Sequence, residues 1–205
     1  MVLWRTRGFR RGRARGSAGL RGAEGSAVLE FAITLPLLVV FVVGIFDFSG
    51  AFNEKQKIEQ AAQEGAIVAG AQPLTDISLG ASSGTNPQSL QPVVAAVFNS
   101  LAGSGVISGC SLNPFPTPKQ TALTWTYTIS GCSSTTSDTL IIVVNRGWSA
   151  APAQSPEPYI LGTTVQVTFP YHWRFNSVIQ LLFPGPSSYS SVTTLTETAI
   201  VHNQM

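Results

Sequence analysis

The chain has 205 residues, of which 44% are hydrophobic and only 11% are charged, and its formal net charge is +2. This small value conceals two regions of opposite sign. Seven Arg and one acidic residue before Ser26 give +6, whereas five basic and nine acidic residues after it give −4. An Arg cluster could contact nucleic acid, but beside an apolar segment it is typical of a membrane topology signal, and secondarily of contact with anionic lipid. We therefore predict no nucleic acid partner.

An apolar segment follows this basic leader, residues 1–25. Phe31 to Phe46 is sixteen residues without a charge, and counting back to Ser26 gives twenty-one. A transmembrane helix needs about 20 residues, so residues 26–46 predict a single span. Because Arg beside a span stays in the cytoplasm, we expect the leader to be cytoplasmic. Residues beyond 47 would then lie outside the cytoplasmic (inner) membrane.

Glu30 is the one acidic residue in the predicted span. A carboxylate in hydrocarbon costs at least a few kcal/mol, so an acid inside a span is a functional candidate. The alternative is that Glu30 sits in the headgroup region beside Arg21. Pro36 removes one helical hydrogen bond and would kink the helix, which membrane helices tolerate where neighbouring groups satisfy the freed carbonyl.

Three classes of membrane segment compete for this region. A cleavable secretory signal has a shorter apolar core, and a plain anchor leaves the acid unexplained. A prepilin-type signal explains the basic leader, the junction and the acid together. Cleavage after Gly25 makes Ser26 the first residue of the mature chain and Glu30 the fifth. Gly19 also precedes an acid by five residues, Glu24, but no apolar run follows that pair.

The helix is predicted to continue beyond the membrane over residues 47–72 and to end at Pro73. These residues lack proline and are mostly helix formers. Small residues recur at three-to-four spacing on one stripe, which suits close packing on a sheet or another helix. The stripe comprises Ala51, Ile58, Ala62, Gly65 and Ala69. We also predict an i,i+4 ion pair between Lys55 and Glu59.

Residues 73–205 form the predicted extracytoplasmic domain, which is long enough for one modest core. Its apolar residues alternate in several short runs, typical of half-buried strands. The expected elements are a helix over 87–101, strands over 121–130, 140–144, 163–169 and 192–201, and a short helix or apolar loop over 173–183. The fold class is therefore α+β: a long transmembrane and stalk helix packed on a small antiparallel β-sheet domain with one or two short helices.

The segment Gly25-Ser-Ala-Val-Leu-Glu-Phe-Ala-Ile-Thr-Leu-Pro-Leu-Leu resembles the N-terminal signature of the TadE-like proteins, pseudopilins of the tight-adherence (Tad) pilus system. Residues 61–66 resemble the family's helix-end element, and residues 163–171, 175 and 181–183 resemble its C-terminal half. The resemblance implies a minor pilin that helps to initiate or anchor a pilus in the inner membrane. The partners implied are other pilins or pseudopilins, the pilus assembly platform and a prepilin peptidase.

Cys110 and Cys132 fall in the region predicted to lie outside the membrane, where disulfides persist. A bridge between them would close a loop of about 22 residues and stabilise the fold by roughly 3 kcal/mol; the alternative is two buried free thiols. A structural zinc site needs about four ligands, so we expect neither a metal nor another cofactor. His172 and His202 are interpreted as isolated sheet or surface residues.

The sequence contains no G-x-S-x-G, H-E-x-x-H or P-loop motif, and we predict that the protein is not an enzyme. Two classes of function stay open. The first, which we favour, is a structural pseudopilin of a pilus or secretion apparatus. The second is a single-pass anchored binding module whose β domain captures a cell-surface ligand, such as wall glycan or another surface protein.

Overall fold

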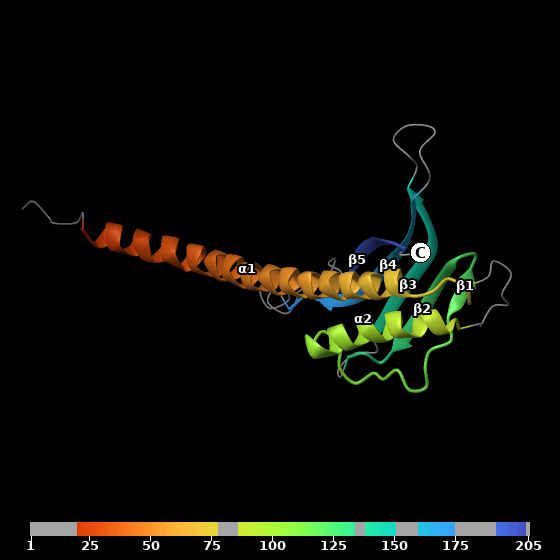
Figure 1. The fold of residues 1–205 in the computed structure, drawn as a ribbon. Coiled ribbons are helices and arrows are strands. Elements are labelled where there is room, and N and C mark those ends of the chain that lie inside the picture. The colour runs from red at the N-terminus through yellow and green to blue at the C-terminus, as the bar shows by residue number, and fades with distance from the viewer. Residues whose placement is uncertain (1–19, 78–85, 134–137, 151–159, 175–191, 204–205) are drawn as a thin grey trace, which may run out of the picture. The chain divides into compact units, whose positions relative to one another are not determined.

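The computed structural model describes residues 20–77, 86–133, 138–150, 160–174 and 192–203 (Figure 1). By its contacts the chain divides into two units, residues 1–42 and 43–205. The helical elements are α1 (Leu20–Ala71), a 3-10 turn η1 (Gln88–Leu90) and α2 (Gln91–Gly103). The strands are β1 (Lys119–Thr121), β2 (Thr124–Ser130), β3 (Thr139–Ala150), β4 (Ile160–His172) and β5 (Val192–His202).

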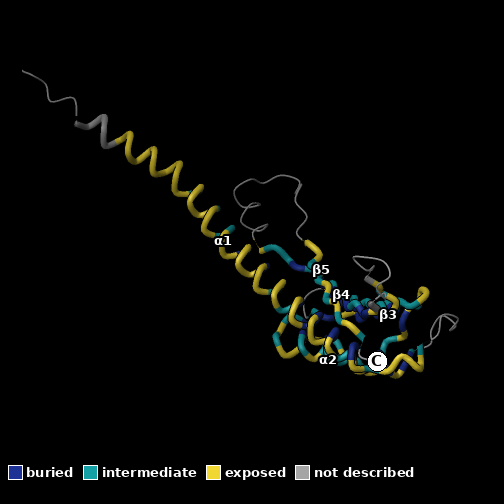
Figure 2. The backbone as a smooth tube through the Cα atoms, turned by 45° about the horizontal axis from the view of Figure 1, so that its top comes forward, coloured by how far each residue is buried: buried dark blue, intermediate teal, exposed yellow. Residues whose placement is uncertain are grey.

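The first unit contains the N-terminal part of α1, which is mostly exposed over residues 25–42 (Figure 2). Phe31 and Phe41 are each 64% exposed. Pro36 lies inside the helix, and the hydroxyl of Thr34 donates to the carbonyl of Phe31 at 3.2 Å. In the described part of the chain, α1 is the one helix that is long and apolar enough to cross a membrane, with a mean hydropathy of 2.6 over its most apolar window.

The second unit begins with the rest of α1, which carries the predicted stripe of small residues. All five stripe positions are buried, together with Ala61, Ala66 and Gly70. A Cβ on Gly65 would collide with Val97 of α2, and one on Gly70 would lie 3.1 Å from Val201 of β5. The helix therefore approaches its neighbours by backbone contact, and it ends at Ala71, before Pro73, as predicted.

The strands form one five-stranded antiparallel sheet in the order β1-β2-β3-β4-β5. The alternation predicted for residues 121–130 is confirmed from Trp125 onward, because Trp125, Tyr127 and Ile129 are buried. The prediction of one strand over that range is wrong at its start: β1 ends at Thr121, Ala122 adopts a positive φ of 52°, and β2 begins at Thr124. The apolar Leu123 fits a strand pattern but occupies this turn.

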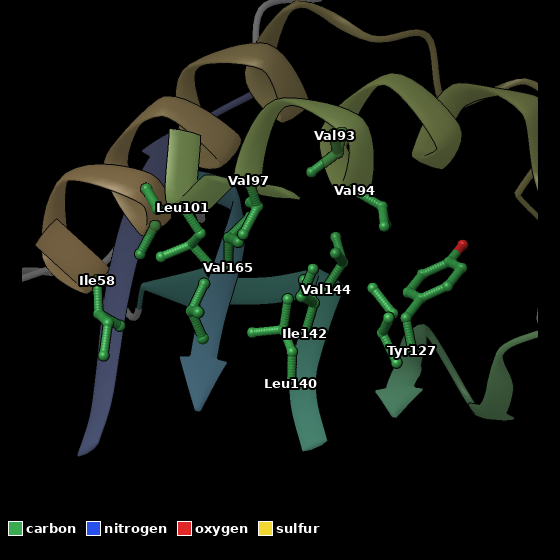
Figure 3. Packing of buried hydrophobic residues seen from close by; sticks show 14 of the residues in the cluster. Ile58, Val93, Val94, Val97, Leu101, Tyr127, Leu140, Ile142, Val144 and Val165 are labelled. Carbon is green, nitrogen blue, oxygen red and sulfur yellow. The ribbon is translucent and has the colours of Figure 1, made fainter. Parts of the chain in front are cut away.

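The core lies between the helices and one face of the sheet (Figure 3). Helix α2 contributes Val93, Val94, Val97 and Leu101, while α1 contributes Ile58. The opposing strands contribute residues that alternate inward, as period-2 side-chain geometry requires: Trp125, Tyr127, Leu140, Ile142, Val144, Val165 and Val167. The fold is thus α+β, as predicted. Residues 175–183, where a second short helix was considered, lie outside the described residues.

Candidate functional site

The predicted processing and assembly residues lie on one turn of α1. The hydroxyl of Ser26 donates to a carboxylate oxygen of Glu30 at 3.2 Å, and both residues are exposed. Among the described residues, and apart from the adjacent residues and the helix's own backbone, no heavy atom lies within 4 Å of a Cβ built on Gly25. Helical spacing thus brings Ser26 and Glu30 together, and the Gly25–Ser26 junction is open to an external protein.

Cys110 and Cys132 form a disulfide in the structure. Cys132 is fully buried beside the end of β2, and its carbonyl accepts a hydrogen bond from the backbone N–H of Ser108 at 3.0 Å. The two links fasten the loop that follows α2 to the end of β2.

Arg146 of β3 is a structural residue that the sequence reasoning missed. Its side chain is buried, and its guanidinium donates to the carbonyls of Ala69, Gln72 (2.8 Å) and Pro73 (3.2 Å). The carbonyl of Ala69 lies in the last turn of α1, and Gln72 and Pro73 follow directly after that helix ends. Cations are favoured at this end of a helix by the helix dipole. Burial lowers the pKa of Arg146, and the nearby carboxylate of Asp76 opposes that shift. Arg146, on strand β3, therefore caps the C-terminal end of α1.

Asp47 and Tyr171 meet at the N-terminal end of the stalk, which is the part of α1 from Asp47 to Ala71. Asp47 is the first acid after the apolar segment and is 6% exposed. The hydroxyl of Tyr171, near the end of β4, donates to both its carboxylate (3.0 Å) and its carbonyl (3.1 Å). Burial, the hydrogen bond to Asp47 and the negative charges of Asp47 and Glu54 raise the pKa of Tyr171 to about 12. Gly50 permits this approach, because a Cβ there would lie 2.9 Å from the hydroxyl.

His172 is a sheet residue, as predicted, because it ends β4. The prediction that it is isolated is wrong. Its Nε2 lies 2.8 and 2.9 Å from the two carboxylate oxygens of Asp138, at the start of β3. His202 lies exposed at the end of β5, as a surface residue. The predicted pairing of Lys55 with Glu59 is also wrong: Lys55 lies 3.3 Å from Glu197 of β5, and Glu59 accepts a hydrogen bond from Gln63.

Two open clefts meet around Tyr171. One, of 320 Å³, is lined by residues of α1 together with Tyr171 and Arg174. The other, of 350 Å³, shares Glu54, Tyr171 and Arg174 with the first and reaches to Asp138 and His172. Burial raises the pKa of Glu54, while Lys57, His172 and Arg174 oppose that shift. The clefts thus carry charges of both signs. Within the described ranges, no three His, Cys, Asp or Glu residues are grouped to hold a metal ion.

The family model described as TadE-like protein matches residues 25–66. The match confirms the resemblance that the sequence predicts for this region, and it covers the Gly25–Ser26 junction, Glu30, the apolar segment and most of the stalk. It ends before the sheet domain, so the resemblance noted for residues 163–183 stays a prediction. No curated protein and no solved structure matches the chain.

Proposed function

We propose that this chain is a membrane-anchored pseudopilin with a structural role in assembling or anchoring a Tad-type pilus or a related secretion apparatus. The observation that supports it best is that three features occur together on α1. The family match begins at Gly25, the same helix is apolar enough to span a membrane, and Ser26 and Glu30 lie one turn apart at its start.

In this proposal the basic leader stays in the cytoplasm and a prepilin-type peptidase cuts after Gly25. The sheet domain is extracytoplasmic and takes part in no catalysis, and no cofactor is needed. Cleavage gives Ser26 a free α-amine one helical turn from Glu30, so that the positive charge of the amine and the negative charge of the carboxylate neutralise each other. A paired amine and carboxylate avoid most of the penalty that each alone incurs in a low-dielectric setting.

Assembly follows from the same pair. Apolar helices gain nothing by leaving lipid for one another, so packing and polar contacts must drive their association. A Glu30 carboxylate that reaches the amine of a neighbouring pilin would set the register between the two helices. The partners of the chain are then other pilins or pseudopilins and the assembly platform in the inner membrane.

The experiment compares two isosteric substitutions on α1. Glu30→Gln removes the charge within the apolar segment, whereas Glu59→Gln removes an exposed charge from the stalk. We expect Glu30→Gln to insert and fold but to lose crosslinking to partner pilins in membranes, and Glu59→Gln to retain it. Normal crosslinking of the Glu30→Gln variant would favour the alternative, an anchored binding module that uses the clefts around Tyr171.

Processing and topology are tested separately. Gly25→Val should leave the 25-residue leader attached, while Gly19→Val should be processed like wild type; the mass of the mature N-terminus distinguishes them. A phosphatase fused after Met205 should be active outside the cytoplasm. A wild-type chain that keeps its leader, or an inactive but stable fusion, would contradict this part of the proposal.

A further inference from the structure

Three aromatic residues from two separate segments meet beside Asp47. Phe48 of α1 packs edge-on against Trp173, with ring centroids 5.2 Å apart, and Trp173 packs edge-on against Tyr171 at 5.1 Å. We call Phe48, Tyr171 and Trp173 the aromatic cluster. Its geometry is of the edge-to-face type that aromatic pairs prefer.

Polar contacts hold the aromatic cluster in one orientation. The indole N–H of Trp173 donates to the hydroxyl of Thr193 in β5 at 2.7 Å, and the hydroxyl of Tyr171 donates to Asp47. Trp173 and Tyr171 therefore each have an apolar ring and a satisfied polar end. Amphipathic rings of this kind are the ones enriched at membrane–water interfaces.

Large apolar side chains are exposed around the aromatic cluster. Phe48 keeps 59% of its area exposed despite its contact with Trp173, and Phe46 and Phe52 on the same helix are 74% and 64% exposed. Phe48 and Phe52 are four residues apart and therefore lie on one side of α1. Phe46 lies on another side and lines a cleft with Tyr171. A cluster of exposed large apolar side chains indicates an interaction site. Arg174 follows Trp173 directly in the chain and is exposed. A cationic side chain at the level of the headgroups is attracted to lipid phosphate.

Distance along α1 indicates what covers this surface. Phe46 is the last residue of the apolar segment, and at about 1.5 Å per residue Phe48 and Phe52 lie about 3 and 9 Å beyond it. The headgroup layer on each side of a bilayer is about 5–8 Å thick. Phe48 then falls within that layer, and Trp173, which contacts Phe48, lies at the same level.

We propose that the aromatic cluster, with Phe46, is a second membrane contact that seats the end of β4 in the lipid headgroup layer, while Phe52 lies at the outer edge of that layer. The inference rests on the proposed anchoring of α1 in a bilayer and adds a contact made by the sheet domain. The occupant is the phospholipid surface that surrounds the chain's own span. Before assembly, this contact keeps the end of β4 at the membrane surface.

The test measures tryptophan fluorescence of the full chain in phosphatidylcholine vesicles that contain brominated lipid, with the bromines placed either close to the headgroups or deep in the acyl chains. The matched control is Trp148. It pairs with Gly162 in β4, nine residues from Tyr171, which corresponds to about 30 Å along a strand. Every chain compared, including the wild-type reference, carries Trp4→Phe, so the leader adds no tryptophan signal, and every chain keeps the buried Trp125.

We expect shallow bromines to quench wild type more strongly than deep ones. Trp173→Phe should lose most of this lipid-dependent quenching, and Trp148→Phe should retain it. Trp173→Tyr, which keeps an amphipathic ring, should show the same loss and guards against a folding defect in the Phe variant. Equal quenching of all variants that float with the vesicles would overturn the second contact while leaving the anchoring intact. A wild-type chain that fails to float would overturn the anchoring and the contact together.

Discussion

The two parts of α1 solve different problems with the same backbone geometry. Over residues 25–42 most side chains are large, branched or aromatic, and most residues are exposed. Over residues 47–71 the buried stripe is built mainly from Ala and Gly. Large apolar side chains suit a helix surrounded by lipid, whereas small ones let a helix approach a sheet closely. A long helix therefore shows where its surroundings change through the size of its side chains as well as through their hydropathy.

The same substitution in both parts gives the sharpest test and the largest expected effect. Gly65→Leu places a bulky side chain against Val97 and Val165, whereas a Cβ on Gly44 has no neighbour within 4 Å among the described residues outside its own helix. Because overpacking a filled core costs about 1–3 kcal/mol even for small additions, we expect Gly65→Leu to destabilise the sheet domain by about 3 kcal/mol or more. Gly44→Leu should leave its stability unchanged. Urea unfolding in detergent, followed by Trp125 fluorescence, measures both; equal midpoints would contradict the comparison.

The disulfide tests whether the sheet domain depends on more than its contact with the stalk. Replacing Cys110 and Cys132 together by Ser should lower the free energy of unfolding by roughly 3 kcal/mol, the loop-entropy value for 22 residues. Reduced wild type should behave like the double variant. Mass analysis of an alkylated, non-reduced tryptic digest should show the two peptides linked, and free alkylation of both thiols in membrane-extracted protein would contradict the bridge.

Substitutions of Arg146 test the contacts at the C-terminal end of α1. Arg146→Leu leaves the carbonyls of Ala69, Gln72 and Pro73 without this donor, and we expect a loss of about 2 kcal/mol. Arg146→Lys keeps the charge but not the planar fork, so it should recover only part of the loss. Hydrogen exchange should show the last turn of α1 opening more readily in the Leu variant. Unchanged protection there would mean that the cap does not stabilise the helix end.

A substitution of Tyr171 tests the contact with Asp47, where we expect the smallest change in the free energy of unfolding. Tyr171→Phe removes the hydrogen bonds to Asp47 and should cost about 1 kcal/mol at pH 7. Burial raises the pKa of Tyr171 from 10.0 to about 12, so its contribution is complete below pH 10 and is lost as the pH rises through 12.

The pH dependence supplies the control for Tyr171. The pKa of Tyr127 is also raised, by burial and by the charge of Asp76, so both tyrosines add to the loss of stability at high pH. Tyr171→Phe should therefore make the loss between pH 10 and 12 less steep without abolishing it. An unchanged slope in the Tyr171→Phe variant would exclude the raised pKa as a source of the effect.

Several features of this chain could be predicted because short, local sequence patterns determine them. The length of the apolar segment predicted the helix that could span a membrane, and Pro73 predicted where α1 ends. The three-to-four spacing of small residues predicted the buried stripe, and period-2 alternation predicted a half-buried strand over residues 163–169, in which Val165, Val167 and Phe169 are buried. The turn at Ala122 was missed because a positive φ at a non-glycine residue leaves no local signal.

The residues around the candidate site were decided by tertiary structure. Tyr171 meets Asp47 across 124 residues, Arg146 meets Ala69 across 77, and Asp138 meets His172 across 34. Lys55 pairs with Glu197 on a strand rather than with Glu59 one turn away on its own helix. Local periodicity determines which face of an element is buried, but it does not encode which residue of another element lies opposite. Strand register and the seating of α1 on the sheet set those pairings, and both depend on how the whole core packs.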